Sequence, residues 1–158
     1  MGTGKTTIGR QLSELLKLEF IDSDREIEAR TGTNIPWIFD VEGEEGFRAR
    51  EEAAIADLTL RQHIILATGG GVVMRASNRH YLHERGVVVY LVTPVSVQLE
   101  RTARDRSRPL LQTPDPRKRL TELMRLRDPL YRETAHIIMP TEGGSARDVA
   151  LRIIHALE

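Results

Sequence analysis

Apolar residues recur at helical spacing near the start of the chain. Ile8, Leu12, Leu15 and Leu16 follow a glycine-rich beginning, and this spacing predicts a helix over residues 4–18. Similar patterns predict further helices over residues 24–30, 44–60, 77–85, 95–104, 117–126 and 146–157.

The predicted helix over residues 44–60 has a clear apolar face. Phe47, Ala54 and Leu58 fall on this face, so we expect them to point into the core. Trp37, the single tryptophan, stands among apolar neighbours and is also expected to be a core residue.

Short apolar runs alternate with the helical segments. They lie at Phe20 and Ile21 and over residues 64–67, 87–92 and 137–139, and the last three are rich in β-branched residues. Helices separate successive runs, so the pattern favours buried parallel strands and an α/β fold in three layers, a parallel sheet flanked by helices. A chain of 158 residues is the size of one such domain, spanning residues 1–158.

Composition and charge exclude several classes of function. Lys plus Arg and Asp plus Glu both number 23, so no overall field attracts nucleic acid or an anionic membrane. Cysteine is absent, which excludes disulfides and thiolate metal sites. No apolar run approaches the roughly 20 residues needed to cross a bilayer, and we expect a cytoplasmic, monomeric protein. His80 and His83 lie one turn apart without an evident third ligand, so we interpret them as surface residues.

The first predicted helix is preceded by small residues and a lysine, Gly2-Thr3-Gly4-Lys5-Thr6-Thr7. This run matches the second half of the G-x-x-x-x-G-K-[ST] phosphate loop, whose backbone N–H groups and helix N-terminus surround phosphate. Lys5 would neutralise the β- and γ-phosphates of ATP, and Thr6 would ligate Mg²⁺. The alternative is a glycine-rich helix start at which Lys5 is only solvated.

The start of this motif is not in the sequence. Its first glycine would lie two residues upstream of Met1, together with the central strand that normally feeds the loop. We therefore expect an N-terminally truncated chain with at most four strands and with exposed strand edges.

Two carboxylates follow the first short strand. Asp22 and Asp24 are expected at the carboxyl end of the sheet, where open α/β folds bind ligands. One would hold Mg²⁺ through water, and the other would take a proton from a substrate hydroxyl. The alternative is that Asp24 serves as a helix N-cap.

Glycines and arginines elsewhere suit an anionic substrate. The run of residues 69–71 is Gly-Gly-Gly and follows a predicted strand, so its backbone would approach a ligand closely. Arg48 and Arg127 would each pair with a carboxylate as a bidentate fork. The alternatives are a flexible turn and two surface arginines.

A further group of arginines borders a proline-rich stretch: Arg101, Arg104, Arg106 and Arg108. We interpret residues 104–116 as a mobile lid that brings positive charge to a transferred phosphoryl group and excludes water. The alternatives are a solvated basic loop or a nucleic-acid patch, but aromatic residues form only 4% of the chain and none lies among these arginines.

Taken in order, these motifs resemble the shikimate kinase family of nucleoside-monophosphate-kinase-like P-loop proteins. The motifs are Gly-Lys-Thr-Thr-Ile-Gly-Arg, Asp22-Ser-Asp24, Glu42-Gly-Glu-Glu-Gly-Phe-Arg48, Ala67-Thr-Gly-Gly-Gly71, Arg108-Pro-Leu-Leu111 and Asp128-Pro-Leu-Tyr131. The resemblance covers the whole chain and implies ATP-dependent phosphorylation of shikimate to shikimate 3-phosphate, on the path to aromatic amino acids.

The resemblance also implies a role for each matching residue. On the nucleotide side, it assigns ATP and Mg²⁺ to Gly2, Thr3, Gly4, Lys5, Thr6, Thr7 and Asp22, with Arg108 at the phosphates and Arg101 against adenine. On the acceptor side, it assigns shikimate to Asp24, Phe39, Phe47, Arg48, Gly70, Gly71 and Arg127, with Asp24 as the base.

Two other functions remain open from the sequence. A gluconate kinase would share the phosphate loop and lid, but its acceptor would not require both Arg48 and Arg127. A nucleotide-binding module that has lost catalysis is the other alternative, because half of the phosphate loop is absent.

Overall fold

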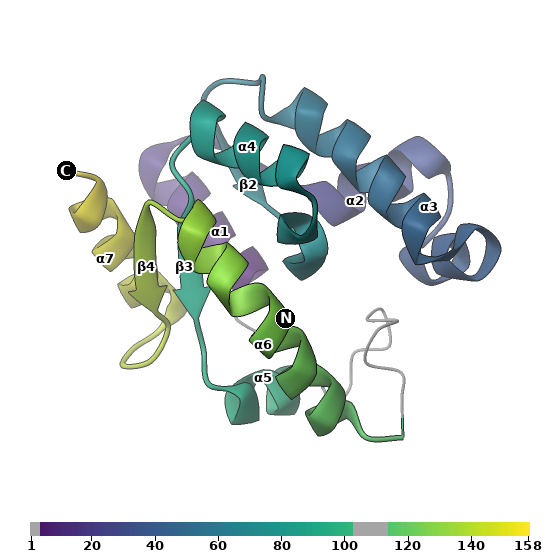
Figure 1. Ribbon diagram of the computed structural model, residues 1–158. Helices are drawn as coiled ribbons and strands as arrows, with labels where there is room; N and C mark the ends of the chain where they lie inside the picture. The colour runs from purple at the N-terminus through teal and green to yellow at the C-terminus, as the bar shows by residue number, and fades with distance from the viewer. Residues whose placement is uncertain (1–3, 103–113) are drawn as a thin grey trace.

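The computed structural model describes residues 4–102 and 114–158 (Figure 1). Its elements, in chain order, are α1 (Lys5–Leu16), β1 (Glu19–Asp22), α2 (Ser23–Thr31), α3 (Ile35–Leu58), β2 (Ile64–Ala67), the 3₁₀ helix η1 (Gly70–Met74), α4 (Ala76–Arg85), β3 (Val89–Val92), α5 (Val95–Thr102), α6 (Pro116–Thr134), β4 (Ile137–Pro140) and α7 (Ala146–Leu157). The predicted α/β class is confirmed, with four strands in the part of the chain described. Gly2, Thr3, Arg108 and most of the predicted lid lie outside these residues.

The strands form two parallel pairs. β1 pairs with β2, with Glu19 opposite Ile64, and β3 pairs with β4, with Val89 opposite Ile137. No backbone pairing joins β2 to β3 within the described ranges. The pairs are held together by the helices that pack on them.

Of the four apolar clusters in the described part of the chain, two connect the helices to the strand pairs. One joins α2 and α3 to β1 and includes Ile27, Ile38 and Leu58, each no more than 1% exposed. The other joins α1 to α7 through residues such as Ile8 and Ile153, and residues of β2, β3 and β4 pack against it. Helix α1 contacts both β2 and α7, so it links the two strand pairs.

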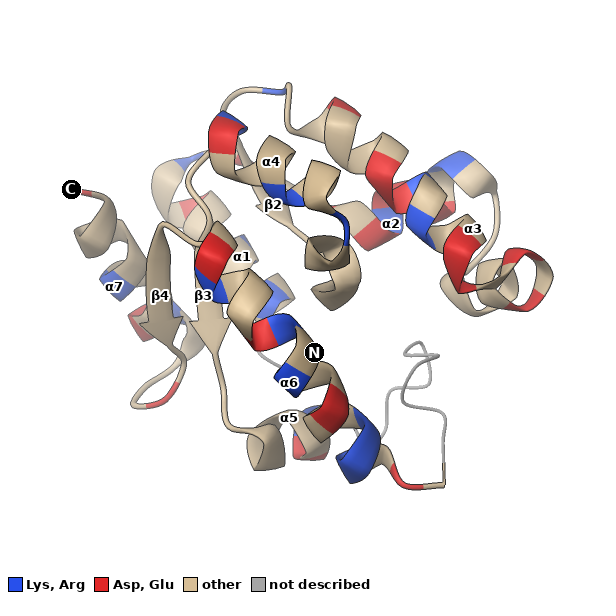
Figure 2. Cartoon of the chain, viewed as in Figure 1, with Lys and Arg blue, Asp and Glu red and all other residues tan. Residues whose placement is uncertain are grey.

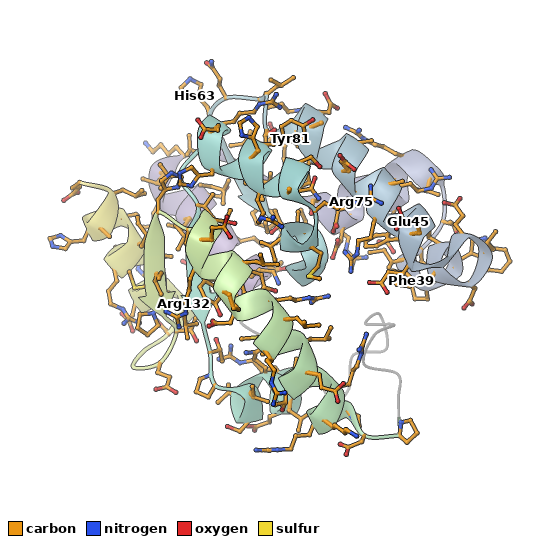
Figure 3. The ribbon with its side chains drawn as sticks, in the orientation of Figure 1. Phe39, Glu45, His63, Arg75, Tyr81 and Arg132 are labelled. Carbon is orange, nitrogen blue, oxygen red and sulfur yellow. The ribbon has the colours of Figure 1, made fainter. Side chains whose placement is uncertain are left out.

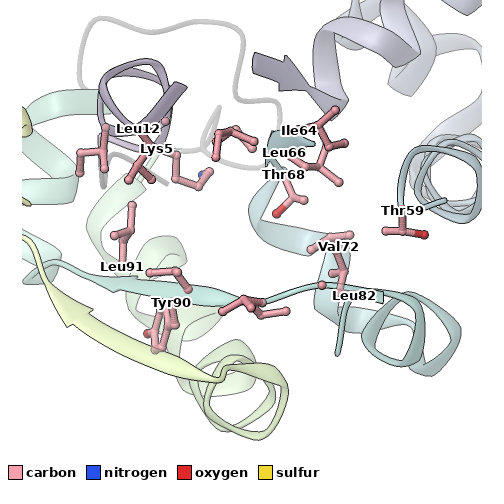
Figure 4. Close-up of a pocket in the computed structure, with 18 of the residues that line it drawn as sticks. Lys5, Leu12, Thr59, Ile64, Leu66, Thr68, Val72, Leu82, Tyr90 and Leu91 are labelled. Carbon is pink, nitrogen blue, oxygen red and sulfur yellow. The ribbon is translucent and has the colours of Figure 1, made fainter. Parts of the chain in front are cut away.

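A cavity of about 700 Å³ is lined by residues of both β2 and β3 (Figure 4). Apolar side chains of α1, β2 and β3, including Leu12, Leu66 and Leu91, contribute to its wall. Lys5 and Gly70 also line it, so the cavity adjoins the predicted site.

Helix α3 begins earlier than the apolar pattern indicates. It starts at Ile35, is capped by the side chain of Asn34 and bends at Gly43, whose φ of 73° interrupts the helical conformation. Trp37 lies on the first segment and is 59% exposed, so the prediction that it is a core residue was wrong. The inward orientation of Phe47 is confirmed, since it is 5% exposed.

Helix α6 also differs from its predicted range, because it continues to Thr134 through Pro129. A proline inside a helix removes one backbone hydrogen bond and normally ends the pattern. Buried residues on both sides of it, Leu123 and Thr134, keep this helix against the core. The continuation carries Arg127 and Tyr131 on the same helix.

Charges of both signs are interspersed over the surface, as along α3 and α6 in Figure 2. Side chains of opposite charge also join neighbouring elements: Arg75, before α4, pairs with Glu45 and Glu52 of α3 (Figure 3). His80 and His83 are exposed, as predicted. None of the described helices is long and apolar enough to cross a membrane.

Candidate active site

The start of α1 presents its backbone amides beside two cationic side chains. Gly4 is the N-cap and has a φ of 84°, a left-handed conformation that glycine adopts without strain. The Nη1 atom of Arg101 lies 3.5 Å from the place that a Cβ on Gly4 would occupy. Lys5 opens the helix, and Thr6 and Thr7 are exposed at its first turn. The described part of the phosphate loop therefore combines amides, Lys5 and Arg101, which suits an anion.

Asp22 and Asp24 have different local roles. Asp22 is the N-cap of α2, and its Oδ1 accepts hydrogen bonds from Asp24 N at 2.9 Å and Arg25 N at 3.4 Å. The capping role that we considered for Asp24 therefore belongs to Asp22, because the helix begins one residue after it. Asp24 instead lies against the glycine turn, where a Cβ on Gly69 would be 2.8 Å from its Oδ1.

Arg48 is buried on α3 and is only 7% exposed. Its Nη1 donates to Glu51 Oε1 at 2.9 Å, and its Nη2 lies 3.6 Å from Glu44 Oε1. The other side of the guanidinium faces the glycine turn, since a Cβ on Gly71 would be 2.2 Å from Nη2. The ion pair with Glu51 and the turn together fix the orientation of this arginine.

Arg127 reaches the same region from α6 and is 3% exposed. Burial lowers the pKa of its guanidinium, and the charge of Arg48 lowers it further. Two arginines that repel each other are thus held together in a poorly solvated place. Such an arrangement is costly unless an anion binds between or beside them, as a bidentate carboxylate does.

Glu51 is a residue of this cluster that sequence reasoning missed. It is fully buried, and burial raises the pKa of its carboxyl group, while Arg48 and Arg127 lower it and Asp24 raises it. Glu51 lies on the buried face of α3 between Phe47 and Ala54. A carboxylate on an otherwise apolar helix face was the signal in the sequence that could have identified it. Its interactions show that Asp24, Arg48 and Arg127 belong to a single electrostatic group.

Tyr131 was also missed as an individual residue. Its hydroxyl donates to the carbonyl oxygen of Gly70 at 2.6 Å, and its phenol interacts electrostatically with the Arg127 guanidinium. The clue in the sequence was its position four residues after Arg127, which places both on one helical face.

An aromatic pair borders the arginines. The rings of Phe39 and Phe47 lie 5.0 Å apart, and the Arg48 guanidinium lies 5.2 Å from the centre of the Phe47 ring. The two phenylalanines therefore place an apolar surface beside Arg48, where apolar contact would suit a carbon ring.

The predicted magnesium ligands supply hard oxygen atoms of the kind that Mg²⁺ prefers. The two capping bonds to Asp22 both use Oδ1, and Thr6 is exposed in the first turn of α1. No group of three or more His, Cys, Asp or Glu residues that could hold a metal occurs in residues 4–102 and 114–158.

Comparison with known proteins identifies relatives along the full chain. The family model described as "Shikimate kinase" matches residues 1–158. Among curated relatives, the shikimate kinase of Halorhodospira halophila is 62% identical over 158 residues, which cover 100% of this chain and 89% of that protein. The shikimate kinase of Acinetobacter baylyi is 59% identical over 157 residues, which cover 99% of this chain and 87% of that protein.

Solved structures agree with this assignment. The shikimate kinase from Acinetobacter baumannii in complex with shikimate has a TM-score of 0.98 and 55% identity, covering 99% of this chain and 88% of that one. A gluconokinase from Sinorhizobium meliloti has a TM-score of 0.54 and 17% identity, and the match covers 99% of this chain and 90% of the gluconokinase chain. At this identity the likeness concerns the fold alone. The full-length family match and these identities show that the chain belongs to the shikimate kinase family, whose members are phosphotransferases.

Proposed function

We propose that this chain transfers the γ-phosphoryl group of ATP to shikimate at the site formed by α1, α2, α3, α6 and the glycine turn. The observation that carries the proposal is the convergence of buried Arg48 and Arg127 with Asp24 against residues 69–71. A small hydroxylated acid matches this arrangement, because one end requires cations and the other a hydrogen-bond acceptor.

On the acceptor side, Arg48 and Arg127 would bind the carboxylate of shikimate. The backbone of Gly70 and Gly71 would contact the ring hydroxyls, since no side chain separates it from a ligand. Phe39 and Phe47 would pack against the ring and exclude water. Asp24 would accept a hydrogen bond from the reacting hydroxyl and take its proton.

On the nucleotide side, the amides after Gly4, the ammonium group of Lys5 and the hydroxyls of Thr6 and Thr7 would surround the phosphates, with Gly2 and Thr3 preceding them. Arg101 would lie along the adenine side. Thr6 and Asp22 would hold Mg²⁺, Asp22 through water, and the ion would neutralise phosphate charge when bound.

The reaction then follows from positioning. The hydroxyl oxygen of shikimate forms a bond to the γ-phosphorus while the bond from that phosphorus to the β–γ bridging oxygen breaks, and ADP leaves with this oxygen. The proton of the hydroxyl passes to Asp24. Lys5 stabilises the negative charge that develops on the phosphoryl oxygens, and we expect Arg108 to contribute to the same stabilisation.

The test is ADP release in the presence of MgATP, with shikimate and with gluconate as acceptors. We expect release that depends on shikimate, and no stimulation by gluconate. Release with gluconate alone would favour a different acceptor. ATP binding without acceptor-dependent release would favour a nucleotide-binding module without catalysis. A further expectation is that the enzyme acts as a monomer.

A further inference from the structure

The hydroxyl of Tyr131 joins two parts of the acceptor site that are distant in sequence. It donates a hydrogen bond of 2.6 Å to the carbonyl oxygen of Gly70, which is 61 residues away. Tyr131 itself lies on α6, one helical turn after Arg127. The bond therefore connects the glycine turn to the helix that supplies an arginine.

The same phenol interacts electrostatically with the Arg127 guanidinium one helical turn before it, because Tyr131 acts to raise the pKa of Arg127 and Arg127 acts to lower that of Tyr131. A phenol has one O–H to donate and lone pairs to accept, whereas a guanidinium only donates. The proton points to Gly70, which leaves the lone pairs of the oxygen available to the Arg127 guanidinium. Burial raises the pKa of Tyr131, so the phenol keeps the proton that this arrangement requires.

The ring of Tyr131 is fixed by packing. It lies 4.8 Å from the ring of Tyr90 and packs against a cluster that includes Val72 and Val73 of η1. A side chain held in this way keeps its hydroxyl at a defined place, which a solvent-exposed partner of Arg127 would not do.

We propose that Tyr131 is a positioning residue that sets the orientation of the Arg127 guanidinium relative to the glycine turn. This inference rests on the proposed function, because it assumes that Arg127 binds the carboxylate of the acceptor. In this role Tyr131 would act through Arg127 and Gly70 and would not need to touch the acceptor itself. Without its hydroxyl, the guanidinium has one fewer acceptor and the site is less well preorganised for a carboxylate.

Tyr90 provides a matched control. Its hydroxyl also forms a hydrogen bond to α6, donating to Asp128 Oδ1 at 2.7 Å, and its ring packs on that of Tyr131. No interaction of this hydroxyl with Arg127 or Gly70 is found in the described part of the chain. Tyr90→Phe therefore removes a comparable anchor of α6 without removing the link within the site.

The experiment measures KM for shikimate and for ATP, kcat and the unfolding midpoint in wild type, Tyr131→Phe and Tyr90→Phe. We expect Tyr131→Phe to raise the KM for shikimate roughly tenfold, the effect of losing one hydrogen bond to a charged group, and to leave the KM for ATP within about twofold. Tyr90→Phe should lower the unfolding midpoint while leaving the KM for shikimate unchanged. An unchanged shikimate KM in Tyr131→Phe, or equal changes in both variants, would overturn the proposal.

A shikimate analogue whose carboxylate is replaced by a hydroxymethyl group gives a second readout. If Tyr131 acts by orienting Arg127, the effect of Tyr131→Phe should disappear with this neutral analogue. A loss of equal size with both acceptors means that the substitution acts only through general structure, and it contradicts the proposal.

Arg127→Lys separates this proposal from the proposed function. If Arg127→Lys weakens shikimate binding and Tyr131→Phe does not, the carboxylate site stands and the role of Tyr131 is refuted. If neither variant affects the KM for shikimate, the proposed function itself is contradicted.

If the Tyr131→Phe variant does not fold, nitrogen-15 NMR of the Arg127 Nε–H in the wild type replaces the kinetic measurement. A sharp, slowly exchanging resonance before shikimate is added is expected, and a broad averaged one would refute prior positioning.

Discussion

The backbone of Gly71 lies directly against the guanidinium of Arg48. A Cβ on Gly71 would be 2.2 Å from Arg48 Nη2 and 2.4 Å from Cζ, closer than any real contact of such atoms. Arg48 has little room to move away, because it is buried and paired with Glu51. Glycine at this position is therefore required by the arginine that packs on it.

Gly71→Ala should displace Arg48 and weaken the acceptor site. We expect the KM for shikimate to rise roughly 10- to 100-fold, since the loss concerns a charge-assisted contact, while the KM for ATP changes little. Steady-state kinetics with each substrate varied in turn measures this. Gly86→Ala is the control, because a Cβ there meets nothing within 4 Å and its φ of −168° is open to any residue. Equal effects of the two substitutions would contradict the argument.

Arg127→Ala should raise the KM for shikimate strongly and that for ATP little. The guanidinium is buried beside residues that we propose bind the acceptor, and losing its hydrogen bonds to a carboxylate would cost about 1.5–3 kcal/mol, or roughly 10- to 150-fold. The two KM values, measured separately, test this, with exposed Arg125→Ala on the same helix as the control. Similar effects on both substrates would show that Arg127 does not act on the acceptor alone.

Much of the fold could be predicted from local patterns. The strand at residues 64–67 and the helix at residues 146–157 match their predicted ranges, because each is a regular apolar pattern between clear breaks. The segment containing Trp37 misled the prediction, since an aromatic residue among apolar neighbours usually indicates a core. Here Ile35 and Ile38 of the same turn are buried, whereas Trp37 faces solvent. Which of these side chains is buried depends on how the helix is oriented against the core.

The acceptor site was predicted by residue type rather than by contact. Arg48 and Arg127 stand out in the sequence as arginines able to pair with a carboxylate, and in the structure they lie close enough for the charge of Arg48 to lower the pKa of Arg127. Glu51 and Tyr131 could not be assigned in the same way. Their importance comes from burial and from contacts between α3, α6 and the glycine turn, which no local pattern contains.

Glu51 and its neighbour Glu52 should affect stability with opposite pH dependence. Burial raises the pKa of Glu51 above its ordinary 4.5, so its contribution to the free energy of unfolding is present below pH 4.5 and lost as pH rises through the folded-state pKa. Hydrogen bonds from Ser77 and Arg75 lower the pKa of Glu52, so its contribution is present above pH 4.5 and lost as pH falls through the folded-state pKa.

Urea unfolding of wild type, Glu51→Gln and Glu52→Gln across this pH range tests the pair. As pH rises, wild type should lose stability relative to Glu51→Gln and gain it relative to Glu52→Gln. The same sign of change for both substitutions would show that Glu51 is not held in a place that disfavours its charge.

Lys5→Ala should abolish turnover while leaving the fold intact. Lys5 opens α1 beside Gly4 and Arg101, where its ammonium group is placed to stabilise the charge that develops on the transferred phosphoryl group. We expect kcat to fall by roughly a thousandfold or more. The circular dichroism spectrum should not change, because alanine is a strong helix former at this position.

Lys118→Ala, at an exposed position near the start of α6, removes a lysine from a comparable place and should leave kcat unchanged. Normal turnover of Lys5→Ala would show that the start of α1 does not bind the reacting phosphates, whereas a changed spectrum would indicate a structural role for Lys5.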